Sequence, residues 1–340
     1  MQTEKIDITS GDRQSGIERA GGILRRGGIV AIPTETVYGL AASAFDDEAI
    51  KKVFAAKGRP QNNPLIVHIS DLNMLYTVAD DIPKAALTLA EKYWPGPLTM
   101  VLKKKDTVAK SVSAGLDTVA VRMPASKAAR DIIRAAGIPL AAPSANISGR
   151  PSPTTAAHVL ADLDGLVDGI VIAEDCAVGV ESTVAALFCE PARLLRPGAV
   201  TAEQLREALP DLVIDKAVLA EPEKGAAVAS PGMLYKHYAP ETEAFLVVGN
   251  SEDYVGFVNS KAGCAALCFN GEAEKITIDK ISYGDVDDKA ELAKNLFGAL
   301  RRVDTLKAQG VYIHAPDKSG IGLAVYNRLL RAAAFKVIEL

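Results

Sequence analysis

The 340-residue sequence has no long hydrophobic run and little excess charge of either sign. No apolar stretch approaches the ~20 residues that a membrane-spanning helix needs, and the polar N-terminus MQTEKIDITSGD lacks the features of an export signal. The 38 basic and 42 acidic residues give a net charge of −4, which argues against a chain built for non-specific binding to a nucleic-acid backbone. We therefore expect a soluble, cytoplasmic protein without membrane association.

Cysteine is scarce, and the common cofactor motifs are missing. The four cysteines lie in or beside apolar runs without zinc-knuckle spacing, so buried and reduced thiols are expected. The four histidines are far apart and none stands in HExxH, so no protein-ligated metal is predicted. The sequence also lacks a GxxxxGK[ST] loop and a complete dinucleotide fingerprint. Any nucleotide must therefore be held in another way.

Sequence patterns divide the chain into two unequal parts. Residues 1–208 combine many short apolar strands with a few helices in no strict order, which predicts an α/β domain with a twisted mixed sheet. Residues 241–340 alternate strands and helices regularly, which is typical of a small Rossmann-like parallel-sheet domain. Residues 209–240 have no clear core face and are too long for an ordinary connection. They are predicted to be a linker.

Two polar loops follow predicted strands in the first part, where a rigid scaffold presents side chains to ligands. PTETVYGLA places Thr34 and several neighbouring polar groups beyond a buried strand, which suits orientation of a small polar substrate. A capped turn before a helix is the alternative. PSANISGRPSPT places Ser144, Asn146 and Arg150 where they could bond phosphate or ribose oxygens. A simple Ser/Asn/Gly turn explains its glycine and prolines but not its arginine.

Cations follow a predicted helix that ends in KGRPQNNPL. Lys57 supplies a mobile point charge, Arg59 supplies a planar fork, and Asn62 adds an amide donor in a loop stiffened by two prolines. This composition suits a polyanion such as a triphosphate. The alternative is that the two cations only complement the dipole of the preceding helix.

Further candidates stand at the ends of other predicted strands. Arg122 in VAVRMP and Arg196 in ARLLRPG precede proline-containing turns and are candidate clamps for carboxylate or phosphate. Ser182 in GVESTV is interpreted as a binding hydroxyl, because the GxSxG elbow of a serine nucleophile is absent. Glu181 beside it could orient a substrate amine, but a glutamate on the surface at a strand edge is the simpler expectation.

Eight motifs, in order, make the sequence resemble the long, two-domain Sua5 form of the YrdC/Sua5 family. They are PTETVYGL, KGRPQNNPLIVHI, WPGPLTMVL, RMP, PSANISG, ESTV, LLRPG and SPGMLYKHYAP. The resemblance implies a YrdC-like catalytic domain over residues 1–208, with helices and a mixed sheet around a concave site. It further implies a linker over residues 209–240 that serves as a lid, and a Sua5-type domain over residues 241–340.

The resemblance also implies an activity. Family members form L-threonylcarbamoyladenylate and pyrophosphate from L-threonine, bicarbonate and ATP, with Mg²⁺ bound to the ATP. The adenylate then serves t6A modification of adenosine 37 in tRNA, through a separate enzyme system that transfers the threonylcarbamoyl group. The resemblance leaves direct contact with tRNA open.

Site roles are implied by the resemblance together with the chemistry of the loops. Lys57 and Arg59 are the expected catalytic residues. The expected L-threonine site comprises Thr34, His68, Arg122 and Ser182. The expected nucleotide site comprises Lys57, Arg59, Asn62, Ser144, Asn146, Arg150, Arg196 and Tyr235.

An RNA-binding module of the tRNA-modification pathway is the alternative to an enzyme. In that case the cationic loops line a groove for tRNA, and RNA affinity falls steeply as salt rises. The net acidity of the chain counts against this alternative.

Overall fold

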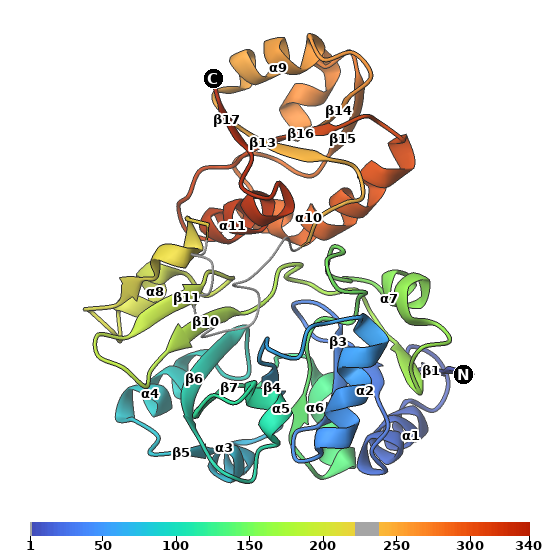
Figure 1. The fold of residues 1–340 in the computed structure, drawn as a ribbon, viewed down its shortest axis with the longest axis vertical. Helices are drawn as coiled ribbons and strands as arrows, with labels where there is room; N and C mark the ends of the chain where they lie inside the picture. The colour runs from blue at the N-terminus through green and yellow to red at the C-terminus, as the bar shows by residue number, and fades with distance from the viewer. Residues whose placement is uncertain (1, 222–237) are drawn as a thin grey trace.

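The structure is a computed structural model that describes residues 2–221 and 238–340. Within these residues the chain forms two units, each with its own sheet, and Figure 1 shows them one above the other. The first unit contains a mixed sheet of 12 strands, and the second a sheet of five strands. The predicted α/β architecture, a mixed sheet followed by a smaller parallel sheet, is confirmed.

The mixed sheet brings together strands that are far apart in the sequence. Its strands lie in the order β1-β9-β2-β3-β8-β4-β7-β6-β10-β11-β12, and β5 pairs with β6. They are β1 (Glu4–Asp7), β2 (Val30–Ile32), β3 (Gly39–Ser43), β4 (Ile66–His68), β5 (Ala79–Asp80), β6 (Leu98–Lys104), β7 (Thr118–Arg122), β8 (Leu140–Ala141), β9 (Gly169–Ile172), β10 (Thr183–Ala186), β11 (Arg193–Arg196) and β12 (Val213–Ile214). The helices are α1 (Arg13–Arg25), α2 (Asp47–Lys57), α3 (Leu72–Val78), α4 (Lys84–Tyr93), α5 (Lys110–Ser113), α6 (Lys127–Ala136), α7 (Ala156–Leu163), α8 (Ala202–Arg206) and the 3-10 helix η1 (Lys216–Val218).

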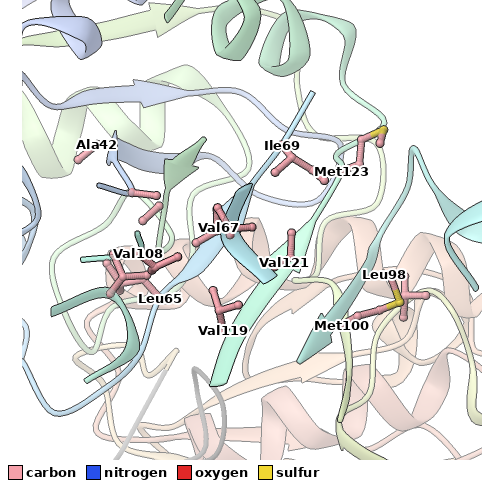
Figure 2. Close-up of a cluster of buried hydrophobic side chains, with 14 of the residues drawn as sticks. Ala42, Leu65, Val67, Ile69, Leu98, Met100, Val108, Val119, Val121 and Met123 are labelled. Atoms are coloured by element: carbon pink, nitrogen blue, oxygen red, sulfur yellow. The ribbon is translucent and has the colours of Figure 1, made fainter. Parts of the chain in front are cut away.

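The core of this unit fixes the register of the strands that carry the polar loops. Figure 2 shows Val67 of β4 and Val121 of β7 on neighbouring strands, with Leu98 and Met100 together on β6. All four side chains are completely buried, and each such side chain stabilises the fold by about 1.5–3 kcal/mol. A register that buries Val67 opposite Val121 also places His68 opposite Arg122 at the strand ends.

Helix α2 delivers the KGR segment to the same region. The carboxylate of Asp46 caps its first turn by accepting hydrogen bonds from two backbone N–H groups. The helix ends at Gly58, which adopts a left-handed conformation with φ of 59°, a backbone geometry that glycine adopts without strain. Lys57 and Arg59 therefore leave the helix on either side of a sharp turn.

The second unit is a regular parallel sheet. Its strand order is β15-β14-β16-β13-β17, and all of its pairings are parallel. Figure 1 shows α10 and α11 on the side of the sheet that faces the first unit, and α9 on the far side. The elements are β13 (Ala244–Val248), α9 (Ser251–Asn259), β14 (Ala265–Cys268), η2 (Asn270–Lys275), β15 (Asp279–Ser282), α10 (Lys289–Val303), η3 (Asp304–Leu306), β16 (Val311–His314), α11 (Gly322–Ala332) and β17 (Val337–Glu339).

Several local features differ from the sequence interpretation. The turn after β2 leads into strand β3 rather than a helix, and Val30 of β2 pairs antiparallel with Ala41. Small residues in GLAAS hide this strand, because the β-branched signature is missing. Within the predicted linker, β12 adds to the mixed sheet by pairing with β11. All four cysteines are free, but Cys189 and Cys264 are only half-buried. In the part of the chain that is described, no helix is long and apolar enough to cross a membrane.

Candidate active site

Strand ends of the first unit surround a pocket of roughly 600 Å³ that is partly open to solvent. Seven of the predicted site residues line it: Thr34, Arg59, His68, Arg122, Ser144, Ser182 and Arg196. They come from the β2–β3 turn, the segment after α2, the ends of β4, β7 and β11, the loop after β8, and the residue before β10. Segments that are far apart in the sequence thus meet at one site.

Arg122 is the centre of the wall formed by the β2–β3 turn. Its guanidinium lies 2.6 Å from the carboxylate of Glu35 and donates to the hydroxyl of Thr36 at 2.8 Å. Burial raises the pKa of Glu35, but the charge of Arg122 and hydrogen bonds to the carboxylate outweigh it, so the pKa lies below its usual value. Thr34 closes the turn by donating to the carbonyl of Val37 at 2.6 Å. The turn is therefore held in one shape before any ligand enters.

His68 presents a neutral imidazole to the pocket. Its Nδ1 lies 3.1 Å from the carbonyl oxygen of Ile66, so Nδ1 carries the proton and donates. Burial, assisted by the charge of Arg122, lowers the pKa of His68 to about 3. The ring therefore stays uncharged at neutral pH and offers Nε2 as a hydrogen-bond acceptor.

Ser182, just before β10, and Arg196, at the end of β11, are joined by hydrogen bonds. The guanidinium of Arg196 donates to the carbonyl of Ser182 at 3.0 Å and to its hydroxyl at 3.1 Å. That hydroxyl also lies 2.7 Å from the hydroxyl of Thr99. Gly198 permits this approach, since a Cβ at that position would stand 2.3 Å from the backbone nitrogen of Thr183. Burial lowers the pKa of Arg196 to about 10, which keeps it charged at neutral pH.

Lys57 contributes to the site from beneath it. The side chain is 1% exposed, and its ammonium donates to the backbone carbonyls of Ser144 and Asn146. Burial, with the charge of Arg59 as a second cause, lowers the pKa of Lys57 well below its usual value. Lys57 does not line the pocket in this structure, but it ties the segment after α2 to the loop after β8. Arg59 does line it, and burial lowers its pKa to about 10.

The other predicted nucleotide residues lie elsewhere or outside the described residues. Asn62 is exposed on the loop after α2. Asn146 is buried beneath the β8 loop and donates to the carbonyls of Ile147 and Arg150. Arg150 turns toward Asp162 and Glu241 instead of the pocket. Tyr235 and most of the predicted lid fall within residues 222–237, which the structure does not describe.

The sequence interpretation missed two features of the pocket. Glu181 is buried rather than on a surface edge, and it pairs with Arg328 of α11 at 2.9 Å. Tyr238 lines the pocket beside Arg196 and packs on Phe297 of α10. Both features depend on contacts between the two units, which no pattern within a single motif reveals. The tyrosine-rich motif that ends in YAP was the only signal for Tyr238.

The lining of the pocket is cationic overall. It contains three arginines and one glutamate, Glu181, whose carboxylate is occupied by Arg328 and Ser152. Low-dielectric walls strengthen the attraction of such a pocket for anions. Hydroxyls of Thr34, Thr36, Ser144 and Ser182 add polar contacts. Among the described residues, no group of three or more His, Cys, Asp or Glu side chains is arranged to hold a metal ion. The arrangement suits a small polar molecule beside a polyanion.

Comparison with known proteins matches both units. Residues 22–198 match the family model Sua5_yciO_yrdC, described as "Telomere recombination", and residues 200–334 match the model described as "Threonylcarbamoyl-AMP synthase, C-terminal domain". A threonylcarbamoyl-AMP synthase of Pyrococcus abyssi is 42% identical, with 95% of each chain covered. One of Bacillus subtilis is 40% identical over 100% of both chains.

A solved structure agrees with these sequence relatives. The crystal structure of P. abyssi Sua5 complexed with L-threonine matches with a TM-score of 0.91 and 38% sequence identity, covering 100% of each chain. Family models that together span most of the chain, full-length relatives and a full-length structural match all agree. The chain therefore belongs to the YrdC/Sua5 family, in its two-domain Sua5 form.

Proposed function

We propose that the chain is an L-threonylcarbamoyladenylate synthase, a nucleotidyltransferase that uses L-threonine, bicarbonate and ATP. The observation that carries this proposal is the cationic, hydroxyl-lined pocket, which stands in a chain whose full-length relatives are named threonylcarbamoyl-AMP synthase. Arg59 and Arg196 suit the phosphates of ATP, and Arg122 suits the carboxylate of an amino acid. The hydroxyls and the neutral imidazole of His68 suit an amino acid.

L-Threonine would occupy the side of the pocket that Thr34, His68, Arg122 and Ser182 line. A homologue 38% identical to this chain has been solved in complex with L-threonine, which supports an amino-acid site in the family. Arg122 is held rigidly by Glu35 and Thr36, so its charge can orient a carboxylate without reorganising. Neutral His68 can accept a hydrogen bond from an amine or hydroxyl without repelling an ammonium group.

ATP would place its phosphates against Arg59 and Arg196. The amine of threonine combines with bicarbonate to give a carbamate and water, and a carbamate oxygen then attacks the α-phosphorus. The bond between the α-phosphorus and the bridging oxygen breaks, and pyrophosphate leaves with that electron pair. Both steps concentrate negative charge, so fixed guanidinium groups stabilise the transition state more than the ground state. Lys57 would act by shaping the Ser144 loop that faces the phosphates.

Magnesium would arrive with ATP, and its ligands would be phosphate oxygens and water. Two carboxylates lie at the pocket, but both are already engaged: Glu181 of the lining by Arg328 and Ser152, and Glu35 by Arg122 of the lining. Neither is placed to serve as a metal ligand. The adenylate would then pass to a separate enzyme system that acts on tRNA.

The test is to incubate the purified protein with ATP, Mg²⁺, L-threonine and ¹⁴C-bicarbonate and to follow labelled adenylate and pyrophosphate. A parallel reaction uses L-serine, and pyrophosphatase is added to draw the reaction forward. Labelled adenylate that depends on threonine is the expected result. Absence of product from folded protein, together with RNA affinity that falls steeply with salt, would instead support the RNA-binding alternative.

A further inference from the structure

Helix α11 of the second unit extends one arginine into the wall of the pocket. Arg328 is 0% exposed, although arginine is rarely buried without partners. Every residue of α11 is buried, because the helix lies between the parallel sheet and the first unit (Figure 1). Asn327 fixes the docking by donating its amide to the carbonyl of Val218, in η1 of the first unit.

Arg328 contacts the two residues that flank the hydrogen-bonded pair of Ser182 and Arg196. Its Nε donates to the carboxylate of Glu181 at 2.9 Å, and a terminal nitrogen donates to the Glu181 carbonyl at 3.2 Å. Its other terminal nitrogen donates to the carbonyl of Pro197 at 2.7 Å. Arg328 thus binds the residue before Ser182 and the residue after Arg196. Its guanidinium also lies 6.0 Å from the ring centre of Tyr238.

Arg328 can influence the pocket through the carboxylate of Glu181. One carboxylate oxygen accepts from Arg328 and the other accepts from Ser152 at 2.5 Å. Glu181 stands directly beside Ser182, whose hydroxyl and carbonyl are bound by Arg196. Besides Arg328, Arg196 is the cation whose charge acts on this buried carboxylate. Buried charges seek an opposite charge because the desolvation penalty is otherwise uncompensated.

We propose that Arg328 is a positioning residue: it occupies the carboxylate of Glu181 and thereby keeps Arg196 directed at the anionic ligand of the pocket. The second unit is therefore part of the nucleotide site, although it contributes no residue to the proposed chemistry. This inference rests on the proposed function, because it takes the anionic ligand to be ATP. It explains why a buried ion pair bridges the two units at the pocket wall rather than at their periphery.

The test compares three variants by calorimetric titration with Mg²⁺ and ATP. Arg328→Met releases the Glu181 carboxylate toward Arg196, so ATP binding should weaken by about tenfold or more. Glu181→Gln should bind ATP at least as tightly as the unaltered chain. The double variant Arg328→Met/Glu181→Gln should recover most of the lost affinity, because no loose carboxylate remains. A purely structural role for Arg328 predicts that the free energy of unfolding falls in Arg328→Met and recovers in the double variant while the Kd of the folded proteins for ATP does not change, and that outcome overturns the proposal.

Arg301→Met is the matched control. Arg301 of α10 also bridges the units, but it binds Asp162 and the carbonyl of Pro151, and it does not line the pocket. Arg301→Met tests whether weaker contact between the two units by itself lowers ATP affinity. Glu181→Gln should not restore any affinity that Arg301→Met loses. If Arg328→Met does not fold, Arg328→Lys serves in its place, with a smaller loss and the same rescue. Failure of the unaltered protein to bind ATP would contradict the proposed function itself, whereas normal binding without rescue contradicts only this inference.

Discussion

Charged side chains inside the protein are arranged differently in the two units. Around the pocket of the first unit, Arg59, Arg122 and Arg196 gather charges of one sign about an open space. In the second unit, buried Glu272 and His314 lie 2.6 Å apart, and the imidazole stacks on Tyr254 with ring centres 4.2 Å apart. The first arrangement leaves a space that an anion can enter, although Arg122 is also paired with Glu35, whereas in the second the two side chains bind each other directly. Arginines around an open space thus mark the candidate site, and a closed buried pair marks structure.

The ion pair between Glu181 and Arg328 connects the two units at the pocket wall. Its loss should have the largest effect on stability. Glu181→Gln leaves a buried guanidinium that cannot release its proton, so we expect a loss of about 3–5 kcal/mol in the free energy of unfolding. Glu272→Gln leaves an imidazole that can be neutral and still accept or donate, so the loss should be nearer to about 1 kcal/mol. Urea denaturation monitored by circular dichroism measures both. Equal losses would contradict the distinction between the two units.

Removal of one pocket arginine should impair activity more than stability. Arg196→Met should lower kcat/KM for ATP by about 10- to 150-fold, as expected for loss of a hydrogen bond between charged groups. Lys92→Met is the control, because Lys92 lies on the surface, where it pairs with Glu207 and stands over the ring of Tyr93. Adenylate formation followed with ¹⁴C-bicarbonate gives kcat/KM for both variants. A loss below threefold for Arg196→Met would remove this residue from the nucleotide site.

His68 should make the first unit sensitive to acid. Its pKa is about 3 in the folded protein and about 6.5 when unfolded, so only the unfolded chain gains a proton between these values. The contribution of His68 to the free energy of unfolding is therefore fully present above pH 6.5 and is lost progressively as the pH drops toward 3. His68→Asn should flatten this slope by up to about 1.4 kcal/mol per pH unit. Urea denaturation at pH 5, 5.5 and 6 tests it.

Half-buried His158 offers the matched comparison, because its lowered pKa has burial as the main cause but the ring is less enclosed. His158→Asn should flatten the slope less than His68→Asn does. An identical slope in the unaltered protein and in His68→Asn would show that His68 is not held neutral.

The smallest effect is expected at Arg150. Its side chain is 47% exposed and pairs with buried Asp162 and exposed Glu241, away from the pocket. Arg150→Ala should change KM for ATP by less than about threefold, because Arg150 does not line the pocket. A large rise in KM would restore the role in nucleotide binding that the sequence predicts. Steady-state kinetics at varied ATP concentration decides between them.

Local patterns in the sequence predicted the smaller sheet and much of the pocket wall. Regular alternation identified the parallel sheet, and polar residues at strand ends identified Thr34, Arg122, Ser182 and Arg196, all of which line the pocket. These residues meet at one pocket because strand ends in a layered fold present their loops together, and their roles in binding stay predictions.

Features that depend on long-range packing were not predictable. The direction of Lys57 is set by carbonyls nearly 90 residues away. The burial of Glu181 depends on Arg328, 147 residues later in the chain. Tyr238 lines the pocket and packs against Phe297 of α10. A single motif contains no information on which distant helix will cover it, so these residues needed the structure.

A structure with L-threonine and a non-hydrolysable ATP analogue would test the contrast between the units most directly. Parallel sheets commonly bind nucleotides at the carboxyl ends of their strands, so the second unit offers a genuine competing location. We expect the phosphates within hydrogen-bonding distance of Arg59 and Arg196, with threonine beside Arg122 and His68. Nucleotide density at the carboxyl edge of the second sheet, with an empty pocket in the first unit, would contradict the account.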